Sequence, residues 1–125
     1  MEFTKLNLSL YGDYFCKESS NIEMDILGTF LMSDVRDWFP SIFREWALDD
    51  KLGEACSGNI TALEKDGEYI ELTDMISEED IPTILKMTRK ELVYVIDAWE
   101  KICELKPKEV IIKYENDEFI VETKN

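Results

Sequence analysis

Residues 59–74 read NITALEKDGEYIELTD, and this stretch decides the fold. Two runs rich in β-forming residues, NITALEK and EYIELTD, flank the dipeptide Asp66-Gly67. Asp-Gly supplies the positive φ angles that a tight hairpin turn needs, so the stretch predicts a β-hairpin. The elements on either side of this hairpin then define the fold class.

A long helix follows the hairpin. Thr88 and Glu91 form a capping box, in which each side chain accepts a hydrogen bond from the other residue's backbone amide. The helix is therefore expected to span residues 89–105, and Pro107 ends it. One apolar stripe recurs along it at three- and four-residue intervals and predicts the face that enters the core: Leu92, Val95, Ile96, Trp99, Ile102 and Cys103.

Further strands are expected at both ends of the chain. Residues 3–11 alternate polar and leucine side chains with the period of a strand. Residues 83–87 form a short strand that begins just after a proline. Residues 109–115 and 118–123 predict a second hairpin around Asn116-Asp117.

The segment between the first strand and the first hairpin has weaker signals. Residues 12–23 and 52–59 are rich in turn-forming residues and are expected to be loops. Residues 24–32 are apolar and fit either a strand or a helix, with Gly28 slightly favouring the strand. This part of the chain therefore leaves one element undecided.

A second helix is expected after this undecided element. Ser33 is a suitable N-cap for a short turn over residues 34–39. The positive end of the helix dipole would stabilise the carboxylates of Asp34 and Asp37 in this turn. A helix over residues 40–48 follows, and its first residue is a proline, whose missing N–H is harmless there.

The order of elements is strand, helix, hairpin, strand, helix, hairpin. It predicts an α+β fold with a mostly antiparallel sheet of two hairpins plus additional strands. Two main helices, at about 34–48 and 89–105, are expected on one face. The chain of 125 residues is expected to form a single domain, 1–125, that buries a core without disulfides.

Composition narrows the function. The chain has 28 acidic and 14 basic residues and a net charge of −14, which argues against binding nucleic acid or anionic membranes. It has no histidine, the commonest general base, and its three cysteines do not match a zinc motif. We expect no enzymatic activity, no metal and no cofactor. No membrane-spanning run or signal peptide is evident, so a cytoplasmic location is expected.

The most acidic stretch is LEKDGEYIELTDMISEED, residues 63–80, with eight carboxylates and one lysine. A calcium loop would need alternating oxygen donors before the glycine, and that spacing is missing. No flanking motif singles out a catalytic pair of carboxylates. A solvated surface and a docking face for a basic partner remain as the alternatives.

The distribution of charge favours the docking face. Residues 61–87 carry eight acids and two bases, whereas residues 88–125 carry nine acids and seven bases. Trp38, beside Asp34 and Asp37, is a further candidate because tryptophan is enriched at interface hot spots. The predicted partner-binding residues are Glu64, Asp66, Glu68, Glu71, Asp74, Glu78, Glu79, Asp80, Trp38, Asp34 and Asp37.

Residues 57–114 carry a pattern that resembles small acidic immunity proteins of bacterial contact-dependent or polymorphic toxin systems. Its parts are a hairpin that starts at Ser57-Gly58-Asn59-Ile60 and ends at Ile70, a helix capped by Thr88 and Glu91 with Leu92 and Trp99, then Lys106-Pro107 and the Ile-Ile-x-Tyr stretch 111–114. The resemblance lies in organisation, and it carries over no binding residue by position.

The resemblance implies an immunity protein that neutralises a cognate bacterial toxin domain by protein–protein interaction. That domain would be basic, for example a nuclease, and the acidic surface would stand in for nucleic-acid phosphates. Two other functions remain open: an acidic adaptor or regulatory protein for a different basic partner, and a small carboxylate-based enzyme.

Overall fold

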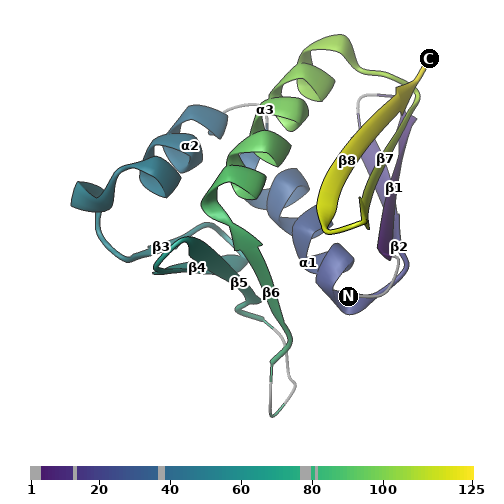
Figure 1. The fold of residues 1–125 in the computed structure, drawn as a ribbon. Coiled ribbons are helices and arrows are strands. Elements are labelled where there is room, and N and C mark those ends of the chain that lie inside the picture. The colour runs from purple at the N-terminus through teal and green to yellow at the C-terminus, as the bar shows by residue number, and fades with distance from the viewer. Residues whose placement is uncertain (1–3, 13, 37–38, 77–79, 81) are drawn as a thin grey trace.

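The strands form two separate antiparallel sheets of four strands each in the computed structural model, which describes residues 4–12, 14–36, 39–76, 80 and 82–125. Three α-helices accompany the sheets among these residues, so the predicted α+β class is confirmed. The two predicted hairpins, however, lie in different sheets (Figure 1).

Sheet A joins the two ends of the chain. Its spatial order is β2 (Tyr14–Ser19), β1 (Thr4–Tyr11), β7 (Glu109–Glu115) and β8 (Glu118–Lys124). The predicted strand 3–11 and the predicted second hairpin are therefore confirmed, and they pair with each other through β1 and β7.

Sheet B is built from the middle of the chain. Its order is β3 (Ala55–Ser57), β4 (Thr61–Asp66), β5 (Tyr69–Asp74) and β6 (Ile84–Thr88). The hairpin predicted from residues 59–74 is β4–β5, and the predicted short strand is β6. The two-residue hairpin loop is Gly67-Glu68 rather than Asp66-Gly67, because Asp66 pairs with Tyr69.

Two helices lie between the sheets. Helices α1 (Ile22–Thr29) and α3 (Arg89–Leu105) each contact strands of both sheets, and α2 (Pro40–Leu48) packs on α3 (Figure 1). The capping box of Thr88 and Glu91 is present, as predicted. Because α1 and α3 are shared, the two sheets enclose one hydrophobic core.

The apolar stripe of α3 enters this core as expected. Leu92, Val95, Ile96, Trp99 and Ile102 are buried, and Cys103 is half-buried. The indole Nε1 of Trp99 donates a hydrogen bond to the carbonyl oxygen of Arg36 at 2.9 Å. The tryptophan thus fixes the segment after α1 as well as filling space.

Residues 24–32 belong to α1 and to the π-helical segment Phe30–Val35 that continues it. The Asn21 side chain accepts a hydrogen bond from the Met24 amide and caps the helix. Helix α1 contacts both sheets, so apolar side chains point in several directions and give no one-sided pattern. Gly28 reflects close packing: an added Cβ would lie 3.1 Å from Leu6 and Lys17 side-chain atoms.

Three local predictions were wrong. The expected loop 12–23 contains β2, an edge strand with mostly exposed side chains and hence no apolar alternation. The expected loop 52–59 contains the short edge strand β3. Ser33 is not an N-cap, because it lies inside the π-helical segment; α2 begins at Pro40 as predicted, after Phe39.

Candidate interaction site

The outer face of sheet B, the face turned away from the core, gathers several of the predicted acidic residues. Strand alternation sends Leu63 of β4 and the apolar residues Ile70 and Leu72 of β5 into the core. Glu64 directly follows Leu63 on β4, and Glu71 lies between Ile70 and Leu72 on β5. Both glutamates therefore project from the opposite face.

Glu64 and Glu71 form a directly opposed pair of like charges. They are register partners on antiparallel strands β4 and β5. Side chains in such positions lie within about 4.5–5.5 Å at their Cβ atoms, and like charges there are destabilising. Neither carboxylate forms a hydrogen bond or an ion pair with another described residue. Their charges are therefore available to a partner.

The lysine next to Glu71 on the outer face of sheet B, Lys86, contacts other residues. Lys86 of β6 is the register partner of Glu71. Its Nζ instead lies 3.8 Å from an oxygen of Asp66 and 4.7 Å from the centroid of the Tyr69 ring. Lys86 thus neutralises one end of the acidic face and leaves the Glu64–Glu71 end open.

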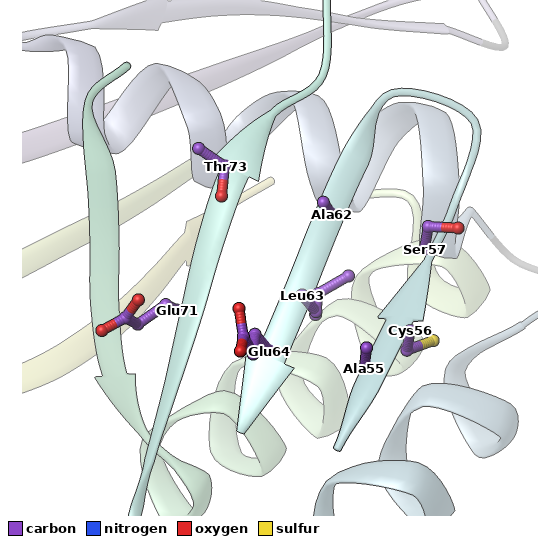
Figure 2. A pocket seen from close by; sticks show the side chains of 8 residues that line it. All are labelled: Ala55, Cys56, Ser57, Ala62, Leu63, Glu64, Glu71 and Thr73. Atoms are coloured by element: carbon purple, nitrogen blue, oxygen red, sulfur yellow. The ribbon is translucent and has the colours of Figure 1, made fainter. Parts of the chain in front are cut away.

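An open depression of about 380 Å³ lies beside the glutamates (Figure 2). Ala55, Ser57 and Ala62 contribute only short side chains to this surface, so the longer glutamates and Thr73 stand around it. Figure 2 shows Glu64 and Glu71 projecting from adjacent strands at one end of the depression. A protruding side chain of a partner can enter it next to two carboxylates.

The remaining predicted acids of this stretch do not share the face equally. Glu68 is exposed in the hairpin loop, next to the face but not on it. Asp74 is half-buried at the end of β5, where its carboxylate accepts a hydrogen bond from the Ile76 amide at 2.9 Å. Asp80 is exposed. Glu78, Glu79, Asp37 and Trp38 lie outside the described residues.

Asp34 has a structural role that removes it from any accessible surface. Its side chain is buried, with 4% of its area exposed. One oxygen accepts hydrogen bonds from the amides of Asn59 and Ile60 at 2.8 and 3.1 Å, and the other accepts one from Thr61 at 2.9 Å. The predicted docking role of Asp34 is therefore replaced by an anchoring role for the turn before β4.

Sequence reasoning missed the neutral part of the site. Tyr69, Thr73 and Ile84 share the outer face with the glutamates, and Tyr69 and Ile84 are 44% and 48% exposed. The period of two in residues 69–73 places Tyr69 and Glu71 on one face. The sequence alone could not place Ile84 on this face, because its position there results from the pairing of β6 with β5.

Comparison of the chain with protein-family models, with curated proteins and with solved structures found no match. Within the described ranges, no three Cys, Asp or Glu side chains come together in a way that could hold a metal ion. None of the described helices has the length and apolar character needed to cross a membrane. The chemistry of the site therefore has to be inferred from its own residues.

Proposed function

We propose that this chain is an immunity-type inhibitor, which binds a basic toxin domain against the outer face of sheet B. The observation that carries this proposal is the Glu64–Glu71 pair. Two like charges at directly opposed cross-strand positions, neither with a cation partner among the described residues, cost the isolated protein stability. Such a cost is typical of residues retained for function.

A basic partner would relieve this cost. An arginine or lysine that enters the depression beside Glu64 and Glu71 would form charge-assisted hydrogen bonds with both carboxylates. Arginine fits best because its planar guanidinium offers several donors at once. Exposed Tyr69 and Ile84 would supply apolar contact around this ion pair.

The charge of the whole chain would act before contact. A net charge of −14 accelerates the approach of a basic domain, and the effect weakens as salt screens it. Desolvated carboxylates at the centre of the interface would then slow dissociation. Inhibition follows if the covered surface of the toxin is the one that binds its anionic substrate.

The test is capture of a partner from the native host with immobilised wild-type protein and with a Glu64→Lys/Glu71→Lys variant. The matched control is Glu45→Lys/Glu104→Lys, which makes the same charge change at exposed positions on α2 and α3. We expect the wild type and the control to retain one basic protein, and the sheet B variant to lose it. Association should slow as salt is raised.

The captured protein decides between the alternatives. A partner whose toxicity in cells is suppressed by the wild type but not by the sheet B variant supports the immunity function. A basic partner without toxicity would indicate an adaptor instead. Equal capture by the wild type and both variants would rule out the outer face of sheet B as the binding surface.

A further inference from the structure

The free edge of strand β3 borders the depression beside Glu64 and Glu71. Strand β3 lies at one edge of sheet B, where Ala55 and Ser57 are exposed and Cys56 is half-buried. Ala55 and Ser57 both line the depression, and their side chains are short (Figure 2). A segment lying along this edge would therefore have access to the two carboxylates across small side chains.

The backbone of β3 has hydrogen-bonding groups that point away from the sheet. The carbonyl oxygen of Glu54 accepts a hydrogen bond from the amide of Lys65 on β4 at 2.7 Å. Bonded residues alternate along an antiparallel pair, so Cys56 also bonds to β4, whereas the backbone groups of Ala55 and Ser57 face outward. Within the described part of the chain, no backbone hydrogen bond outside the strand ladders involves Ala55 or Ser57.

The other edge of sheet B has protection that β3 lacks. Strand edges in proteins are commonly protected by charged side chains, especially lysine, and by proline. Strand β6 contains Lys86 and begins shortly after Pro82, and the amide of its last residue, Thr88, donates a hydrogen bond to the Glu91 carboxylate. Strand β3 has the sequence Ala-Cys-Ser, with no charge and no proline. Its edge is therefore open to a further strand.

The charge of the depression defines the residue that fits it. Glu64 and Glu71 supply two carboxylates, and no lysine or arginine is among the described residues that line the depression. Lys65 of β4 is directed to the core side, where its Nζ donates a hydrogen bond to the carbonyl oxygen of Asp49 at 2.9 Å. Lys86 lies at the opposite edge of the sheet, on β6. A cation for the two glutamates therefore has to come from a partner.

The register of β3 determines where this cation lies. Ala55 is the register partner of Glu64. A residue opposite Ala55 on an added strand would lie two strand spacings, about 9.6 Å, from Glu64. The side chains of an arginine and a glutamate can meet over the small alanine, and the guanidinium offers donors to more than one carboxylate.

We propose that β3 accepts an extended segment of the basic partner as a fifth, antiparallel strand of sheet B, with an arginine opposite Ala55. The residue two positions before this arginine lies opposite Ser57, beside the short side chain of Ala62, so a valine fits there. This inference rests on the proposed function, because it takes the basic partner from there and specifies how that partner binds.

The probe is the end-blocked peptide Ser-Thr-Val-Thr-Arg-Thr-Ser, with binding and amide hydrogen exchange followed by NMR on the full chain. At a peptide concentration about ten times the Kd, roughly a tenth of the protein stays free, so exchange at the Ala55 and Ser57 amides should slow about tenfold. The amide of Cys56 already bonds to β4 and should not change. Absence of binding, or binding without protection at Ala55 and Ser57, would overturn the proposal.

Two control peptides separate strand addition from attraction to an acidic protein. N-methylation of the valine and the arginine removes the donors that would bond to β3 and should abolish the protection. Citrulline in place of arginine keeps the shape of the side chain without its charge and should weaken binding about tenfold. Equal protection by the methylated peptide, or equal affinity of the citrulline peptide, would contradict the assigned binding mode.

A matched pair of variants tests the position of the site. Ala55→Lys places a cation opposite Glu64 within the chain and should weaken peptide binding about tenfold. Thr123→Lys makes the same charge change on β8, an edge strand of sheet A, and should bind like the wild type. Both positions are exposed, so neither change disturbs the core. Equal loss of binding in the two variants would mean that the peptide responds only to total charge.

Capture of the partner separates this inference from the proposed function. Ser57→Pro removes one outward N–H without breaking a bond to β4, and prolines are tolerated on edge strands. Capture that is lost with Glu64→Lys/Glu71→Lys but kept with Ser57→Pro would retain the docking face and overturn strand addition. Capture that survives the glutamate reversals but not Ser57→Pro would overturn the acid-dependent function and retain strand addition. The methylated peptide makes the same distinction without altering the chain.

Discussion

The carboxylate of Asp34 lies against the backbone of Gly58, so closely that a Cβ at residue 58 would come within 2.5 Å of the Asp34 Cγ. Gly58 does not have a positive φ angle, so only this contact requires a glycine. Asp34 cannot move aside without losing its bonds to the amides of residues 59–61. The two residues therefore form one unit that anchors the start of β4.

Gly58→Ala should destabilise the protein by about 1–3 kcal/mol, the usual cost of inserting a methyl group into a packed site. Asp34→Ala should cost roughly 2–5 kcal/mol because it leaves backbone amides without an acceptor. Asp34→Ala removes the contacts with Cγ and Oδ2, at 2.5 and 2.8 Å, but keeps the Cβ at 2.6 Å, so part of the cost of Gly58→Ala should disappear in this background. Urea unfolding of the two single variants and the double variant measures this coupling. Additive effects would contradict it.

Trp99→Ala should lower the free energy of unfolding by about 3–5 kcal/mol, the range for truncating a large aromatic side chain in a core. Trp99 is 3% exposed and spans the gap between α3 and the Arg36 carbonyl. Trp99→Phe retains an aromatic ring but loses the hydrogen bond, so it should cost about 1–2 kcal/mol. Thermal unfolding ranks the two variants. A wild-type melting temperature for Trp99→Ala would mean that the stripe is not core.

Local signals predicted much of the fold. The capping box at Thr88 and Glu91, the apolar stripe of α3 and both hairpins depend on neighbours in sequence. The structure contains each of them, with the turn of the first hairpin shifted by one residue to Gly67-Glu68. The division into two sheets depends on pairing between distant segments: β1 pairs with β7 across about a hundred residues of chain. No local pattern specifies that pairing.

Local signals also predicted part of the candidate site, whereas the rest depends on the pairing of strands. The alternation of β4 and β5 identifies Glu64 and Glu71 as outward-facing. The register that sets them opposite each other, and the position of Lys86 beside Asp66, require the folded sheet. Asp34 was assigned to the partner-binding surface because it lies near Trp38 in the sequence, and tryptophan is enriched at interfaces. The backbone amides that bind its carboxylate come from residues 59–61, about 25 residues along the chain.

Cys56 should titrate later than an exposed thiol. Burial on the inner side of β3 raises the pKa of Cys56 above its ordinary value of 9.0, against smaller opposing effects of the Ser57 backbone and Lys65. Iodoacetamide at pH 8 should therefore modify exposed Cys16 well before Cys56. Peptide mass spectrometry of a time course measures both rates. Equal rates would contradict the burial of Cys56.

The same shift predicts a pH dependence of stability. A thiol whose pKa is raised by folding favours the folded state fully below its unfolded pKa, and this contribution is lost as the pH rises through the folded pKa. The wild type should therefore lose stability above about pH 9 relative to Cys56→Ala, in which the other titrating groups are unchanged. Parallel stability profiles of the two proteins between pH 8 and about pH 10 would disprove this linkage.

Glu64→Lys should stabilise the isolated protein, because it replaces the repulsion between residues 64 and 71 by an attraction. Cross-strand pairs of this kind contribute about 0.2–1 kcal/mol. Reversing any acid in a chain of net charge −14 also relieves general repulsion, so the matched control is Glu68→Lys in the exposed hairpin loop. The gain for Glu64→Lys should exceed that of the control in urea unfolding. The difference should persist at physiological ionic strength, because directly opposed cross-strand positions lie closer together than the Debye length of about 8 Å. Equal gains would mean that the facing glutamates do not repel each other, and the stability cost on which the proposed docking surface depends would be absent.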